Sequence, residues 1–184
     1  MSPLSLVGVE DGGFEAFKPN QTTLLCAALM VGDRIESLRL GRVTVDGREA
    51  TDVLSGMLVN IRCDAVILGG VSFAGFNVVD PHRLHDELGV PMIVYSGDRP
   101  DSPSVLAALK AHFPDWVERW APIARLGDVY SVVTKAGHPP VFFEVVGESR
   151  DWAEGVLRSC ASLTRAPEPV RVAGIVARGL TRSA

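Results

Sequence analysis

The sequence predicts an α/β fold in which helices flank a mixed β-sheet, and three observations lead to this class. Extended apolar runs separated by turn residues dominate residues 4–45, which is typical of antiparallel strands. The apolar spacing then changes to the period of amphipathic helices. Between these helices lie short, continuous apolar runs, which indicate strands buried on both faces, as in a parallel sheet.

The amino-terminal part contains three expected strands. Residues 4–9 are apolar, include β-branched members and are followed by a turn-forming Asp-Gly-Gly sequence. Residues 22–31 form a second apolar run, and a tight Gly-Asp joint connects it to residues 35–45, which is a hairpin signal. The third run alternates polar and apolar residues, as in a strand with one face in water. We therefore expect three antiparallel strands in succession.

The middle of the chain has the pattern of a β-α-β unit. Apolar residues recur at helical spacing over residues 50–61, and a buried strand is expected at 65–68. A loop at residues 72–77 then leads to a helix at 81–88 and to another short strand at 91–95. Three antiparallel strands followed by helix, strand, helix and strand is the order of the ribonuclease H-like fold.

The carboxyl-terminal part adds helices and a hairpin. A helix over residues 102–112 is expected to be capped by Ser102. Residues 130–134 and 141–146 flank a proline-containing turn, as in a hairpin at a sheet edge. Helical spacing then returns twice, and the last helix is expected to begin near Pro167.

Composition limits the class of protein. The chain has 184 residues and no linker that would divide it, so we expect one domain over residues 1–184. Its longest apolar run, residues 22–32, is shorter than the roughly 20 residues of a membrane helix, so no membrane partner is expected. The scattered Cys26, Cys63 and Cys160 are typical of buried thiols in a cytoplasmic protein. A net charge of −4 gives no overall attraction to nucleic acid, although a local basic groove could supply one.

Five segments spread along the chain carry a resemblance to a known family. Residues 70–80 contain its most specific part, Phe-Ala-Gly-Phe-Asn, and the other segments are residues 7–14, 44–51, 89–94 and 167–173. Together they resemble a largely archaeal family of unknown function, number ninety-nine among such domains, which is similar to endonuclease V. The resemblance implies an endonuclease V-like fold and an activity that cuts DNA or RNA beside deaminated bases with Mg²⁺ or Mn²⁺.

Three acidic residues are the candidate catalytic and metal-binding groups. Glu10 and Asp11 end the first strand, and Asp46 ends the third. Nucleases of this fold place carboxylates at strand ends, because divalent metals bound there activate water and stabilise the leaving oxygen. Each position also has a structural interpretation, since Asp-Gly sequences form turns.

Two positions depart from what the resemblance implies. Endonuclease V has an Asp followed by Gly after the fourth strand, whereas this chain has Gly69 and Gly70. The related family places a His after Arg-Val-Ala near the carboxyl terminus, whereas this chain has Gly174. Both departures weaken the expectation of cleavage.

The candidate substrate-binding residues are Phe76, Asn77 and Arg171. Phe73 and Phe76 could stack on a base, and Asn77 could position one. The structural alternative is that the rings fill the core and the Asn shapes the turn. Arg171 belongs to a stripe of arginines on the last helix that could contact phosphates, or that could simply be a solvated face.

The sequence thus leaves two functions open. The first is a nucleic-acid-processing protein of the endonuclease V-like kind, in which Glu10, Asp11 and Asp46 are the remaining acids that face the metal. The second is a catalytically inactive module that binds nucleic acid or another ligand on the same scaffold.

Overall fold

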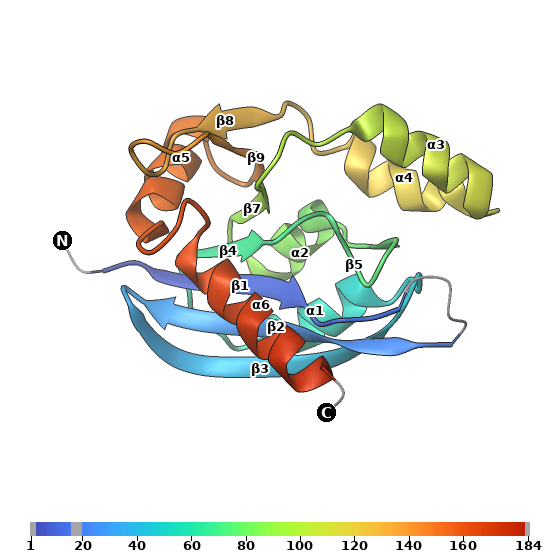
Figure 1. Ribbon diagram of the computed structural model, residues 1–184, viewed down its shortest axis with the longest axis horizontal. Coiled ribbons are helices and arrows are strands. Elements are labelled where there is room, and N and C mark those ends of the chain that lie inside the picture. Colours follow the sequence, from blue (N-terminus) through green and yellow to red (C-terminus); the bar gives the residue numbers. More distant parts are fainter. Residues whose placement is uncertain (1–2, 16–19, 183–184) are drawn as a thin grey trace.

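The computed structural model describes residues 3–15 and 20–182, and within them a seven-stranded sheet forms the centre of the molecule (Figure 1). Its strands lie in the order β3-β2-β1-β4-β7-β9-β8. A separate two-stranded ladder pairs β5 with β6. The bounds are β1 Ser5–Asp11, β2 Thr22–Val31, β3 Arg34–Thr44, β4 Ala65–Leu68, β5 Ser72–Phe73, β6 Asn77–Val78, β7 Met92–Ser96, β8 Tyr130–Val132 and β9 Val141–Val146.

Strand β1 joins the antiparallel and parallel parts of the sheet. It pairs antiparallel with β2, which pairs antiparallel with β3, and it pairs parallel with β4 on its other side. Strand β7 continues parallel to β4, and β9 and β8 complete the sheet as an antiparallel edge. The predicted mixed sheet, with three antiparallel strands followed by parallel ones, is confirmed.

Helices cover both faces of this sheet. Their bounds are α1 Ala50–Leu58, α2 Pro81–Leu88, α3 Ser102–His112, α4 Trp116–Ala124, α5 Arg150–Cys160 and α6 Glu168–Thr181. Side chains alternate between faces along a strand. Val7 and Val9 of β1 therefore join the core under α1 and α2, whereas Leu6 joins the core under α5 and α6. Helix α6 crosses β1 and β2, as Figure 1 shows.

Several local predictions need correction. Helix α3 is capped by Asp101, whose carboxylate accepts a hydrogen bond from the backbone N–H of Ser104, so Ser102 is the first helical residue and not the cap. The segment 72–77, expected to be a loop, contains the short ladder of β5 and β6. Helix α4 was not predicted. Helix α1 ends at Leu58, before the predicted limit at residue 61.

Helix α4 packs beside α3, away from α5 and α6 (Figure 1).

None of the helices in the described ranges is long and apolar enough to cross a membrane.

Candidate active site

Glu10 and Asp11 form an acidic pair at the carboxyl end of β1. The backbone N–H of Asp11 donates a hydrogen bond to Glu10 Oε2 at 3.1 Å. Burial, reinforced by the negative charge of Asp11, raises the pKa of Glu10 to about 7. Burial also raises the pKa of Asp11, against the hydrogen bond that its Oδ2 accepts from the backbone N–H of Ala74 at 2.6 Å. The two carboxyl groups are therefore costly to ionise together, and a nearby cation would relieve that cost.

One cationic side chain already reaches this pair. Arg178 of α6 places Nη1 at 3.9 Å from Glu10 Oε2, and its charge lowers the pKa of both acids, although less than burial raises it. The Arg178 side chain is 54% exposed, so it remains open to solvent on its other side. The acidic pair therefore lies beside a partly exposed positive charge.

The two glycines that depart from the endonuclease V pattern lie against these same side chains. A Cβ atom added to Gly69 would overlap the carboxylate of Glu10, and one added to Gly174 would overlap the guanidinium of Arg178. The space of the two missing side chains is thus occupied by Glu10 and Arg178. The altered positions are coupled to the site, because each glycine makes room for one member of the ion pair.

Asp46 and Asp11 bind the same loop. Asp11 accepts a hydrogen bond from Ala74, and Asp46 accepts one from Phe76. Its Oδ1 accepts a hydrogen bond from the backbone N–H of Phe76 at 2.8 Å, and its own N–H donates to the carbonyl of Ala74 at 2.8 Å. Gly75 between them has a φ of +81°, and a Cβ there would overlap Asp46 Oδ1. Asp46 therefore has the turn-forming contacts of the structural interpretation.

These acids do not gather into a cluster of three in the structure. Among residues 3–15 and 20–182, no group of three His, Cys, Asp or Glu side chains is arranged to hold a metal ion. Glu10 and Asp11 come together, while Asp46 is bonded to the loop between β5 and β6.

Asn77 is a fully buried connector between β3, α1 and β6. Its Nδ2 donates to the carbonyl of Thr44 at 3.0 Å, and its Oδ1 accepts from the backbone N–H of Ala50 at 3.0 Å. Glu49 completes this frame. Burial alone would raise the pKa of Glu49, but hydrogen bonds led by that of the Thr44 N–H lower it to about 2. Contact between Asn77 and a substrate, as predicted from the sequence, would require it to give up these bonds.

Phe76 lies at an aromatic pocket, whereas Phe73 is buried in the core. The Phe76 ring meets Phe113 edge to face, with 5.4 Å between ring centroids. The pocket has a volume of about 490 Å³. Its lining residues are Phe14, Val45, Asp46, Gly75, Phe76, Ala108, His112 and Phe113. The sequence indicated Phe76 but not Phe113, because the partner ring comes from a distant helix.

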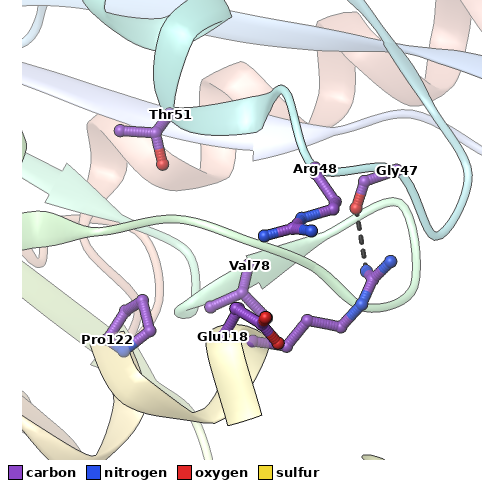
Figure 2. A pocket seen from close by; sticks show the side chains of 7 residues that line it. Gly47, Arg48, Thr51, Val78, Glu118 and Pro122 are labelled. Atoms are coloured by element: carbon purple, nitrogen blue, oxygen red, sulfur yellow. Dashed lines mark hydrogen bonds between the residues drawn. The ribbon is translucent and has the colours of Figure 1, made fainter. Parts of the chain in front are cut away.

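Arg119 is a functional candidate that the sequence analysis missed. It is buried on α4, where its Nη1 donates to the carbonyls of Gly47 at 2.8 Å and Phe76 at 2.7 Å. Figure 2 draws the bond to Gly47 as a dashed line, in a small pocket whose labelled residues include Arg48 and Glu118. Arg119 thus ties α4 to the β3–α1 connection and to the loop that carries Phe76. The sequence contains no distinctive signal for Arg119, because the helix that carries it was not predicted.

Arg171 is paired within its own helix. Its guanidinium bonds to both carboxylate oxygens of Glu168, and the Arg171 side chain is 28% exposed. The structure therefore brings Arg178, rather than Arg171, to the acidic pair, although both belong to the arginine stripe predicted on α6.

Comparisons with known proteins place the chain in a family. A family model described as Endonuclease dU matches residues 3–181. A UPF0215 protein of Methanopyrus kandleri is 34% identical over 183 residues, covering 97% of this chain and 92% of the relative. A UPF0215 protein of Thermococcus gammatolerans is 33% identical over 180 residues, covering 95% and 90%.

Solved structures share the fold. A protein of unknown function from Archaeoglobus fulgidus has a TM-score of 0.86 at 21% identity, covering 98% of this chain and 99% of the other. Endonuclease V of Bacillus subtilis has a TM-score of 0.64 at 12% identity, covering 96% and 80%. Ciona intestinalis endonuclease V, in complex with DNA containing an inosine, has a TM-score of 0.60 at 12% identity, covering 97% and 85%.

The endonuclease V-like fold and the predicted archaeal relatives are thereby confirmed. The family model spans nearly all of the described residues, and the relatives exceed 30% identity over most of the chain. The chain belongs to the Endonuclease dU family.

Proposed function

We propose that this protein is a divalent-metal-dependent endonuclease that acts on DNA or RNA at deaminated bases in the cytoplasm. The observation that carries the proposal is the acidic pair Glu10 and Asp11, held at a strand end where ionisation of both groups calls for a cation. Two of the comparisons support a nucleic-acid substrate. The family is described as Endonuclease dU, and the Ciona endonuclease V is in complex with DNA that contains an inosine.

The donor set of this pair fits a hard cation. Carboxylate oxygens are the ligands that Mg²⁺ and Mn²⁺ prefer, and Mg²⁺ keeps several waters while it takes only one or two protein carboxylates. Glu10 and Asp11 would hold the ion, and a bound ion of this kind supplies an activated water and stabilises the leaving oxygen. Asp46 fixes the adjoining loop, and its predicted place among the ligands is tested separately.

The remaining side chains have roles in this proposal that need no metal geometry. Arg178 sits beside Glu10 with half of its side chain in solvent, so it can attract a phosphate to the acidic pair. Phe76 presents a ring at the aromatic pocket, where an unpaired base can stack. Arg171 bonds to Glu168 through Nε and Nη2, so its Nη1 can contact a phosphate that lies along α6.

The decisive experiment is a cleavage assay on end-labelled single- and double-stranded DNA and RNA with one uracil, one hypoxanthine or no deaminated base. We expect cuts that need Mg²⁺ or Mn²⁺ and that disappear with a chelator. Glu10→Gln and Asp11→Asn should each lower the rate by on the order of 100-fold or more, because even indirect partners of a metal site cost 10- to 100-fold. Asp46→Asn should lower it within that smaller range if Asp46 contributes to the site.

Asp52→Asn is the matched control, because this acid pairs with Arg83 on the surface of α1 and α2. It should cleave like the wild type. Absence of cleavage on every substrate, or cleavage that Glu10→Gln and Asp11→Asn leave unchanged, contradicts the proposal.

A second candidate function is a catalytically inactive module that binds nucleic acid or another ligand. The specific observation in its favour is that Glu10 and Arg178 fill the space of the side chains absent at Gly69 and Gly174. This alternative predicts retention on deaminated nucleic acid that weakens with salt, with no metal-dependent cutting.

A further inference from the structure

Another carboxyl group, far from the acidic pair in sequence, is buried, and within the described part of the chain its hydrogen bond comes only from its own backbone N–H. Glu144 lies in β9 opposite Val94 of β7, and it is 7% exposed. Within residues 3–15 and 20–182, the structure contains no hydrogen bond or ion pair from another residue to the Glu144 carboxyl group. Burying a carboxyl group without a partner from another residue is costly, so the presence of Glu144 in an apolar strand needs an explanation.

Glu144 faces a pocket of about 180 Å³ at the carboxyl ends of β4 and β7. This edge of an α/β sheet is the usual place for a ligand crevice. Apolar side chains from four parts of the chain form most of the wall. The lining residues other than Glu144 are Gly70, Val71, Ser72, Val94, Tyr95, Ser96, Pro100, Ser102, Val105, Ile123 and Leu126.

The size of the pocket selects the class of ligand. An engineered apolar cavity of about 150 Å³ binds benzene, so a space of this size accommodates one six-membered ring and is tight for a fused purine. Mostly apolar walls with a few hydroxyl groups and one carboxyl group suit a flat heterocycle whose polar edge meets Glu144. The ionised carboxylate only accepts hydrogen bonds, whereas a protonated carboxyl group also donates one. A ring that binds the ionised Glu144 must therefore present an N–H to it.

We propose that this pocket receives a single pyrimidine base turned out of the nucleic-acid strand, and that Glu144 accepts a hydrogen bond from the imide N–H of uracil. Cytosine carries an unprotonated ring nitrogen at that position, so it would set one acceptor against another when Glu144 is ionised. The inference rests on the proposed function and deepens it by naming the pocket that receives the base and the residue that reads its imide edge.

The pocket adjoins the acidic pair along the chain. Gly70 lines the pocket, and the residue before it, Gly69, lies directly against the carboxylate of Glu10. Consecutive Cα atoms are only about 3.8 Å apart, so a base held over Gly70 brings its backbone phosphates to the end of β1 and β4, where Glu10 and Arg178 lie on the other face of the sheet. An enzyme that acts next to a damaged base needs this arrangement.

The test measures binding without cleavage. Fluorescence anisotropy with a chelator present, at a pH above 7 where Glu144 is ionised, would compare labelled single-stranded oligonucleotides that differ at one position: deoxyuridine, deoxycytidine, deoxyinosine or an abasic residue. The wild type should bind the deoxyuridine strand about 10- to 100-fold more tightly than the deoxycytidine strand, which is the range for a hydrogen bond to a charged group.

Glu144→Gln should reduce that preference to within a few-fold, because the Gln amide can donate to cytosine as well as accept from uracil. Glu148→Gln, at an exposed position just beyond the same strand, is the matched control and should keep the preference. Val105→Phe places a ring in the pocket from α3 without altering Glu144, and it should weaken binding of the deoxyuridine strand towards that of the abasic strand.

The outcomes separate this inference from the proposed function. Preferential binding of deoxyuridine that depends on Glu144, without any cleavage, supports the pocket and rejects the nuclease. Cleavage with a base preference that Glu144→Gln leaves unchanged overturns the pocket and keeps the nuclease. Binding that does not depend on the base, including the absence of binding, also overturns the pocket, and Val105→Phe decides the case if Glu144→Gln does not fold.

Discussion

Two buried carboxyl groups make the stability of this fold depend on pH near neutrality. Burial together with the charge of Asp11 raises the pKa of Glu10 to about 7, and burial raises that of Glu144 to about 7. Because both values lie above the unfolded value of 4.5, the folded chain holds these protons more tightly. Their stabilising contribution is therefore complete below pH 4.5 and is lost as the pH rises through 7, at up to about 1.4 kcal/mol per pH unit for each proton.

Urea denaturation at a series of pH values from 4.5 to 8 measures this effect. Glu10→Gln and Glu144→Gln should each flatten the decline in the free energy of unfolding, while Glu148→Gln should follow the wild-type curve. Parallel curves for all four proteins would show that neither buried carboxyl group carries a shifted pKa.

At the residue scale, the sequence identified groups whose position follows from a strand end, and it missed groups defined by distant partners. Glu10 and Asp11 are found together because they are neighbours in one strand. Asn77 was assigned to substrate, although the structure uses its amide to join β3 and α1. Glu144 did carry a signal, since it is the one charged residue in the apolar run of β9, but its pocket is assembled from the segment after β4, from β7, and from α3 and α4.

At the element scale, the contact between β1 and α6 makes a sharp prediction. A Cβ atom on Gly8 would overlap the backbone of Pro169 and Val170, which cannot move without shifting the start of α6. Gly8→Ala should therefore destabilise the fold by roughly 1 to 3 kcal/mol or more. Gly56→Ala is the matched control, because a Cβ there meets nothing within 4 Å and α1 should gain up to about 1 kcal/mol.

Urea denaturation midpoints of the two glycine variants measure the difference. A Gly8→Ala midpoint equal to that of the wild type would mean that the start of α6 does not pack against β1 as closely as in the structure. A loss in Gly56→Ala would mean that the side of α1 at Gly56 is covered in solution.

Whole elements were predictable where one period continued long enough to be distinctive. The strands β1 to β4 and the helices α1, α2 and α6 have clear periods, and Asp80 caps α2 with hydrogen bonds from two backbone N–H groups. Helix α4 was missed because it is short, contains Pro122 and buries only its Arg119 side chain. Capping of α3 moved by one residue because Asp101 and Ser102 are both good caps, and only the geometry chooses between them.

At the scale of the whole molecule, the helices α3 and α4 bury fewer residues than the other described helices. Figure 1 shows the two helices side by side at one end, away from α6. Helix α3 buries Leu109 and α4 buries Arg119, whereas α6 buries seven residues against the sheet. Segments with few buried contacts open at a lower free energy than the global unfolding reaction.

Native-state hydrogen exchange should therefore divide the helices. Amides of α3 should exchange through openings that cost clearly less free energy than those of α6, whose amides should exchange near the free energy of global unfolding. A deoxyuridine oligonucleotide should slow exchange in α3 more than in α5, because Val105 and Ile123 wall the pocket over Glu144, whereas α5 covers the opposite face. Equal protection of α3 and α6 in the free protein would show that the α3–α4 pair unfolds only with the sheet. If the deoxycytidine strand slows amide exchange in α3 as much as the deoxyuridine strand does, the opening of α3 and α4 does not depend on which base is bound.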